Sequence, residues 1–230
     1  MTNPDFLTQA PLPAGRSIVF LDVDGTLIDS FPGIRDGFFL ALDAMDMPYP
    51  DDDFVAHIPG PPMEETLARA GVPEGRLREA FTIYMDYARD TGWLQAGPMP
   101  GMVELLPKLK EQGFYLATAT SKGTAAARQI LDHFGMLQHL DFLGTAQEDG
   151  PRRGKAKVIE YVLDSLNLHD RTEDIIMVGD RNHDIDGAGV FGIDTIAVTW
   201  GYGDPDEWAR AKHTVSTADQ LQEVILGWHA

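Results

Sequence analysis

Residues 17–30 read SIVFLDVDGTLIDS, an apolar run that ends in two aspartates and a glycine. The apolar residues stand at consecutive rather than alternate positions, which is the pattern of a strand covered on both faces, as in a parallel sheet. Asp22 and Asp24 follow this strand, and Gly25 lets the chain turn at once. Two carboxylates brought so close repel each other until a cation or a shared proton relieves the repulsion. The stretch therefore predicts a buried strand with an acidic site at its carboxyl end.

Four more apolar runs of this kind follow along the chain, with helical patterns between them. Gly113 and Gly135 stand where glycine commonly ends a helix. The alternation predicts an α/β fold with a doubly wound, Rossmann-like parallel sheet and right-handed crossovers. The predicted strands are 17–22, 115–120, 140–145, 174–178 and 195–199, and the predicted helices of the core are 103–112, 124–134, 156–166, 185–190 and 218–226.

The block from 31 to 98 breaks this alternation, because it has helical patterns at 34–45, 64–70 and 74–90 but no convincing strand. Further helices packed on the same sheet are one interpretation. A strandless block of this length is hard to place as a simple crossover between two strands, so we favour an insertion. We predict a helical-bundle cap domain at 31–98, with hinges near 30–33 and 97–101. The catalytic core then comprises 1–30 and 99–230, with 1–15 as a loosely ordered tail.

The chain is strongly acidic, with a formal net charge of -18 over 230 residues. Nucleic acids and anionic membranes are bound by basic patches, so these partners are not expected. No apolar stretch approaches the roughly 18–20 residues of a membrane span, and residues 1–15 lack the pattern of a signal peptide. The chain has no cysteine, which excludes disulfides and thiolate metal ligands. We expect a cytoplasmic protein that acts on small molecules, as a monomer or a dimer.

Polar residues gather at the ends of several predicted strands, where ligands bind in doubly wound sheets. Carboxylates without cysteine or a histidine pair at ligand spacing favour magnesium over zinc, and His183 is interpreted as a neighbour of the site or a surface residue. A hydroxyl and an ammonium supply what a phosphate needs. The residues are Asp22 and Asp24 after the first strand, Thr120, Ser121 and Lys122 after the second, Asp180 and Asp184 after the fourth, and Lys155 after the third.

The stretch 187–192, GAGVFG, matches the glycine pattern of dinucleotide-binding loops. That pattern has to follow its strand directly, and here acidic residues intervene that would repel a pyrophosphate. We therefore interpret these glycines as sites of close packing.

Taken together, the motifs resemble those of the haloacid dehalogenase superfamily of phosphatases over the whole chain. The first motif is similar to DVDGTLIDS at 22–30, and the others correspond to Thr120, to Lys155 and to Gly179-Asp180 with Asp184. The resemblance implies that Asp22 is a nucleophile forming an aspartyl-phosphate and that Asp24 is the general acid and base. It implies Mg²⁺ held by Asp22, Asp180 and the backbone carbonyl of Asp24, with Asp184 binding directly or through water. The expected phosphate-binding residues are Val23, Asp24, Gly25, Thr26, Thr120, Ser121 and Lys155.

The stretch 60–67, GPPMEETL, resembles the cap loop of members similar to phosphoglycolate phosphatase and 5′-nucleotidase. Gly60, Pro61 and Pro62 are thus predicted substrate contacts, with an ordinary helix-start turn as the alternative. Arg152 and Arg153 either add positive charge near the phosphate or are solvated.

Dehalogenases of this superfamily lack a second aspartate such as Asp24, which favours a phosphatase. We predict a Mg-dependent phosphatase acting on small phosphomonoesters, similar to phosphoglycolate phosphatase. The alternatives are 5′-nucleotidase or pyrophosphatase activity, a phosphosugar mutase, and a phosphate-responsive regulatory protein of the receiver type. Receiver domains lack a sequence like Asp24-Gly25-Thr26 after the corresponding aspartate, which disfavours this last alternative.

Overall fold

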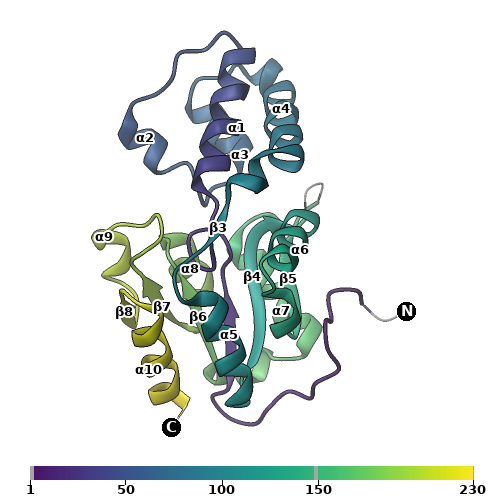
Figure 1. Cartoon of the computed structure of the whole chain (residues 1–230), viewed down its shortest axis with the longest axis vertical. Helices are drawn as coiled ribbons and strands as arrows, with labels where there is room; N and C mark the ends of the chain where they lie inside the picture. The colour runs from purple at the N-terminus through teal and green to yellow at the C-terminus, as the bar shows by residue number, and fades with distance from the viewer. Residues whose placement is uncertain (1–2, 148–149, 230) are drawn as a thin grey trace.

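A six-stranded sheet forms the lower part of the molecule in this computed structural model, which describes residues 3–147 and 150–229 (Figure 1). The strand order is β5-β4-β1-β6-β7-β8, and all neighbours run parallel. The chain thus starts in the middle and extends first to one side and then to the other, which confirms the doubly wound sheet. The strands are β1 (Ile18–Leu21), β4 (Tyr115–Gly123), β5 (Phe142–Ala146), β6 (Ile175–Gly179), β7 (Asp194–Val198) and β8 (His213–Val215).

Helices cover both faces of this sheet, which is why β1 is apolar at consecutive positions. Val19 and Leu21 pack in one hydrophobic cluster with α5 (Met102–Glu111), α6 (Thr124–His133) and α10 (Ala218–His229). Ile18 and Phe20 point to the other face and pack against α7 (Lys155–Leu166) and α8 (Asn182–Gly189). All four side chains are fully buried. The remaining short helices of the core are η3 (Leu137–His139), η4 (His169–Asp174) and α9 (Pro205–Trp208).

A separate group of helices lies above the sheet in Figure 1. It has a hydrophobic cluster of its own, in which Phe38, Leu42 and Leu67 are fully buried. Where the chain leaves and re-enters the sheet region, β2 (Ile28–Asp29) pairs antiparallel with β3 (Gly97–Pro98). The helices are α1 (Phe31–Ala44), α2 (Asp52–Ala56), α3 (Met63–Arg69), η1 (Glu74–Arg76), α4 (Leu77–Asp90) and η2 (Gly92–Gln95).

The N-terminal segment lies along the outer strand β5. Phe6 forms an antiparallel bridge with Phe142, and the Leu143 amide donates to the Asp5 carbonyl at 2.8 Å. The Tyr161 hydroxyl donates to the Asp5 carboxylate at 2.5 Å. These contacts hold residues 5 and 6 against the core, within the segment 1–15 that the sequence predicts to be a loosely ordered tail. An edge strand has unpaired backbone groups, and this segment pairs with some of them.

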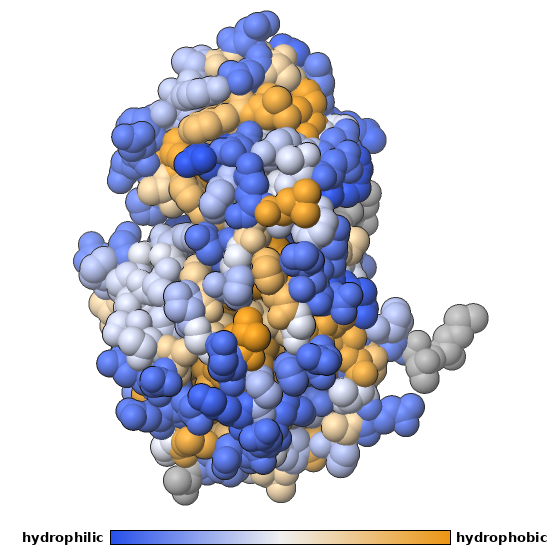
Figure 2. Space-filling model, viewed as in Figure 1, coloured by the Kyte–Doolittle hydropathy of each residue, from blue (hydrophilic) through white to orange (hydrophobic). Residues whose placement is uncertain are grey.

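The surface is hydrophilic over most of the face shown in Figure 2, with hydrophobic patches on the helical group and at the waist below it. Within the described part of the chain, none of the helices combines the length and the apolar character needed to cross a membrane.

Candidate active site

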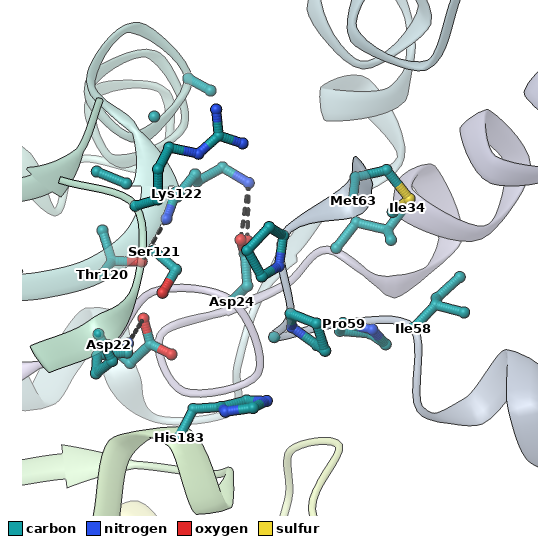
Figure 3. Close-up of a pocket in the computed structure, with 18 of the residues that line it drawn as sticks. Asp22, Asp24, Ile34, Ile58, Pro59, Met63, Thr120, Ser121, Lys122 and His183 are labelled. Atoms are coloured by element: carbon teal, nitrogen blue, oxygen red, sulfur yellow. Dashed lines mark hydrogen bonds and ion pairs between the residues drawn. The ribbon is translucent and has the colours of Figure 1, made fainter. Parts of the chain in front are cut away.

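The end of β1 places two carboxylates in different directions. Asp22 stays buried at the strand end, where its Oδ1 accepts a hydrogen bond from the Val23 amide at 2.8 Å. The chain then turns, with Gly25 at a φ of +82° and its amide donating to the Ile28 carbonyl at 2.8 Å. A positive φ is accessible to glycine without steric cost. In Figure 3 the Asp24 carboxylate points toward the Lys122 ammonium.

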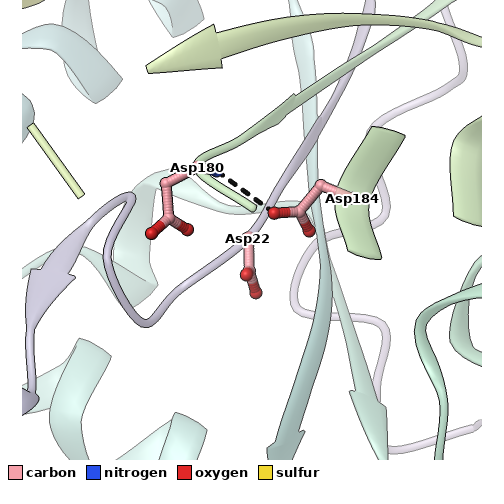
Figure 4. Close-up of side chains that lie close together, drawn as sticks. All are labelled: Asp22, Asp180 and Asp184. Atoms are coloured by element: carbon pink, nitrogen blue, oxygen red, sulfur yellow. Dashed lines mark hydrogen bonds between the residues drawn. The ribbon is translucent and has the colours of Figure 1, made fainter. Parts of the chain in front are cut away.

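Three buried carboxylates converge below this turn, as Figure 4 shows. Ligand oxygens of Asp22, Asp180 and Asp184 all lie within 4.8 Å of one another. Asp180 follows β6, and Asp184 lies in the first turn of α8. Asp184 accepts hydrogen bonds from the amides of Asp180 and Arg181, both at 3.1 Å, which fixes its orientation.

Glycines give Asp180 the room that it occupies. A Cβ atom on Gly25 would lie 2.2 Å from the Asp180 carboxylate, and one on Gly201 would lie 2.3 Å from it. Gly179 is equally close to Asp184, because its Cβ would lie 2.2 Å from the carboxylate carbon. The backbone is therefore shaped around these two carboxylates.

The electrostatics of this cluster favour a bound cation. Burial raises the pKa of Asp22 to about 6, against the lowering effect of Lys155. Burial and the neighbouring carboxylates of Asp184 and Asp22 raise the pKa of Asp180 well above its usual range. A divalent cation among these groups would remove the repulsion, and oxygen donors suit Mg²⁺. The cluster is thus able to hold a metal ion.

Lys155 lies directly beside these carboxylates, at the start of α7. Its ammonium is 2.8 Å from Asp22, 2.7 Å from Asp184 and 2.9 Å from the Ala119 carbonyl. Burial alone would lower the pKa of Lys155, but the two carboxylates outweigh this effect and raise it. A Cβ on Gly187 would lie 2.8 Å from the Lys155 side chain, which confirms close packing at this glycine. A Cβ on Gly189 or Gly192 would have no atom within 4 Å, so the prediction of close packing is wrong for these two glycines.

Asp24 has side-chain partners that its sequence motif does not indicate. The Lys122 ammonium lies 2.8 and 3.1 Å from its two oxygens, and the Ser30 hydroxyl donates to it at 2.5 Å. Lys122 follows the predicted hydroxyl pair at the end of β4, so its position at a strand end was visible in the sequence. Its contact with Asp24 spans 98 residues and depends on how β1 and β4 pair.

A cavity of about 170 Å³ opens over these groups, and Figure 3 shows residues of its wall. The predicted residues Val23, Gly25 and Thr26 lie in the turn behind it, where the Thr26 hydroxyl faces Asp180 at 3.4 Å. Their phosphate-binding role stays a prediction. The predicted residues that line the cavity are Asp22, Asp24, Thr120, Ser121, Lys155 and Asp184 from the core and Gly60, Pro61 and Pro62 from the loop before α3.

Arg181 holds the loop before α3 against the core, and no sequence motif indicates this role. Its guanidinium donates to the Pro59 carbonyl at 2.5 Å and pairs with Glu207 at 2.9 and 3.0 Å. His183 also lines the cavity, where burial and the nearby charge of Arg181 lower its pKa. A Cβ on Gly60 would lie 3.2 Å from the His183 ring, so the loop packs closely on the core.

Arg152 and Arg153, for which the sequence allowed either a role near the phosphate or simple solvation, have different contacts. Arg153 lines the cavity and donates to both Glu64 oxygens at 2.7 Å, which joins the loop before α7 to α3. Arg152 instead lies over the Tyr161 ring, 3.6 Å from its centroid.

Comparisons with known proteins agree with this geometry. A model of the haloacid dehalogenase-like hydrolase family matches residues 18–198. The tyrosine-protein kinase PtkA of Mycobacterium tuberculosis is 41% identical over 212 residues, covering 90% of this chain and 72% of PtkA. A 5′-nucleotidase of Pseudomonas aeruginosa is 35% identical over 210 residues, covering 90% and 94% of the two chains. A crystal structure of a predicted phosphatase from Clostridium acetobutylicum superposes with a TM-score of 0.86 at 33% identity, covering 93% and 100%. The chain belongs to the haloacid dehalogenase-like hydrolase family.

Proposed function

We propose that this protein is a Mg-dependent phosphatase that hydrolyses small phosphomonoesters through an aspartyl-phosphate. The observation that carries the proposal is the position of Asp22. Its carboxylate lies at the wall of the cavity, 2.8 Å from the Lys155 ammonium and within the cluster of three buried aspartates. A nucleophile of this kind needs a positive environment, because it has to approach an anionic phosphate.

The chemistry has two steps. In the first, an Asp22 oxygen attacks phosphorus, the bond from phosphorus to the leaving oxygen breaks, and Asp24 gives that oxygen a proton. In the second, Asp24 takes a proton from water, whose oxygen attacks phosphorus and releases Asp22 and inorganic phosphate. Lys155, Thr120 and Ser121 line the cavity where the phosphoryl oxygens would lie and would stabilise their charge.

Asp22, Asp180 and Asp184, with the backbone carbonyl of Asp24, would hold the Mg²⁺. The all-oxygen donor set and the raised pKa values of Asp22 and Asp180 support this assignment. A bound Mg²⁺ supplies positive charge that screens the carboxylate from the phosphate.

Residues 31–98 would act as a cap over this site, with 1–30 and 99–230 as the catalytic core. Two features support this division. The paired strands β2 and β3 stand at the two crossing points of the chain, and Gly60, Pro61 and Pro62 reach the cavity from the helical side.

Phosphate release from a panel of phosphorylated metabolites, with Mg²⁺, tests the proposal. The panel comprises phosphoglycolate, nucleoside monophosphates, hexose phosphates and pyrophosphate, which also separates the 5′-nucleotidase and pyrophosphatase alternatives. We expect release that is lost with EDTA and in Asp22→Asn. Release that is unaffected by both treatments would refute the proposal.

Transfer of the phosphoryl group to an acceptor other than water is the alternative on the same site. It covers a phosphosugar mutase, and the M. tuberculosis relative is named as a protein kinase. Product analysis separates the two, because a transferase retains the phosphate in an organic product and a phosphatase releases it as inorganic phosphate.

A further inference from the structure

A second cavity, of about 740 Å³, lies beside the first, between α4 of the helical group and α6 of the core. The two cavities share part of their lining, including Lys122, which contacts Asp24, and Ala126 on α6. The two cavities are therefore adjacent and have part of their walls in common.

Contacts between the helical group and the core lie at both cavities. At the first, Arg153 pairs with Glu64 at 2.7 Å. At the second, the Trp93 ring of η2 packs edge-on against the His133 ring at the end of α6, with centroids 5.2 Å apart. The helical group thus contacts the core at both places, and side chains of both parts line the second cavity.

The sizes of the two cavities point to leaving groups of different length. The first is about 11 to 17 times the 10–15 Å³ that hold one water molecule, so a phosphoryl group with a two- or three-carbon alcohol would fill much of it. The second falls in the range of about 300–1,000 Å³ typical of sites for drug-sized ligands. A short phosphate leaves this second cavity empty.

The walls also indicate the chemistry of the occupant. The surface common to both cavities is largely apolar and includes two aromatic rings from α4, which suits a flat ring system. Thr82 and Gln129 line only the second cavity and offer hydrogen-bonding groups for a polar ring edge. The apolar residues common to both cavities are Ile34, Phe81, Tyr84, Met85, Ala88 and Ala126.

We propose that the second cavity is the binding site of the leaving group and selects nucleoside 5′-monophosphates over two- and three-carbon phosphates. This inference rests on the proposed function, since it names the substrate class of the same site. A ring bonded directly to the phosphate oxygen stays in the first cavity, whereas a base carried by a pentose spans both. The sugar then passes Ala126, and the base lies between α4 and α6.

The test compares kcat/KM for AMP, UMP, phosphotyrosine and phosphoglycolate in the full-length protein and in Ala125→Phe. Ala125 is exposed on α6 and lines only the second cavity, so the added ring narrows that cavity. Asp132→Phe is the matched control, because it places the same ring at an exposed position of α6 that neither cavity includes.

We expect the wild type to prefer AMP or UMP at least tenfold over the other two substrates. Ala125→Phe should lower kcat/KM for the nucleotides at least tenfold, mainly through KM, and change phosphoglycolate less than twofold. The control should change neither by more than twofold. A higher kcat/KM for phosphoglycolate or phosphotyrosine in the wild type would overturn the inference, as would an equal loss for all substrates in Ala125→Phe.

If the wild type hydrolyses none of these compounds, the proposed function fails, and calorimetric titration with AMP then decides the inference by itself. Binding that is at least tenfold weaker in Ala125→Phe than in Asp132→Phe supports the site. Equal binding, or none to the wild type, overturns it.

Discussion

Replacing Asp22 by asparagine should stabilise the metal-free protein while it removes the proposed nucleophile. Burial raises the pKa of Asp22 from 3.8 to about 6 in the folded chain. At neutral pH Asp22 is therefore ionised in the folded chain although its buried environment favours the protonated form, and this lowers the stability of the fold. Asparagine has nearly the same shape and no charge, and Lys155 keeps its contacts with Asp184 at 2.7 Å and with the Ala119 carbonyl at 2.9 Å.

The magnitude follows from the shift. The difference between about 6 and 3.8 is roughly 2 units, and at 1.36 kcal/mol per unit the ionised Asp22 costs about 3 kcal/mol of folding free energy. The sign follows from the raised folded pKa: this cost is fully present above pH 6, shrinks as the pH falls through 6, and is absent below 3.8. About half of it remains at pH 5.

The assay is thermal and urea denaturation of wild type and Asp22→Asn in EDTA, at pH 8 and pH 5. At pH 8 the variant should be more stable by up to about 3 kcal/mol, or roughly 6–12 °C in Tm for a chain of this size. The difference should be about half as large at pH 5. Adding Mg²⁺ should stabilise the wild type more than the variant, because a metal bound only to the folded state adds stability. A variant that is less stable than wild type in EDTA at pH 8 would refute this reasoning.

Other substitutions test the surrounding geometry. Gly25→Ala should abolish Mg²⁺-dependent stabilisation in denaturation scans, because the new Cβ would lie 2.2 Å from the Asp180 carboxylate. If Mg²⁺ stabilised the variant as much as the wild type, the close contact between Gly25 and Asp180 would be wrong. Tyr202→Phe removes the hydroxyl that accepts from the Ser30 amide at 2.8 Å, and should lower the free energy of unfolding by about 1–3 kcal/mol in urea titrations. Glu64→Gln weakens a pair whose side chains are one-third exposed, so the stability should change by less than about 1 kcal/mol, while limited proteolysis between the helical group and the core becomes faster. Equal proteolysis rates would show that this pair does not hold the two parts together.

The core of the fold was predictable because its strands are buried on both faces. All five predicted strands are present within a few residues of their predicted bounds, and Gly113 and Gly135 end helices at positive φ. The sixth strand was missed, since β8 (His213–Val215) is short, lies at the edge and exposes two of its three residues. Such a strand has no continuous apolar run to reveal it.

The helical group was predicted less completely. The sequence pattern predicted α1, α3 and α4 but not α2 (Asp52–Ala56). This short acidic helix starts where the Asp51 side chain accepts a hydrogen bond from the Phe54 amide. The strands β2 and β3 have two residues each and pair with each other. Neither is long enough to show the apolar pattern of a strand in the sequence.

The candidate site was predictable where its residues follow strands and was missed where two distant parts meet. Asp22, Asp180 and Lys155 stand at the ends of strands or the start of a helix, so parallel pairing alone brings them together. The contact of Arg181 with Pro59 spans 122 residues and depends on how the helical group sits on the core. A sequence pattern holds no information on that placement.

The central claim is that Asp22 becomes phosphorylated, and the Asp24→Asn variant with p-nitrophenyl phosphate tests it most directly. The nitrophenolate leaves without a proton, so the first step needs no acid, whereas the second step lacks its base and should slow by about 10²–10⁴-fold. Rapid-quench kinetics should show a burst of one nitrophenolate per protein, and mass spectrometry of the quenched chain should place one phosphoryl group on Asp22. Steady turnover without a burst, or a phosphoryl group on another residue, would contradict the account.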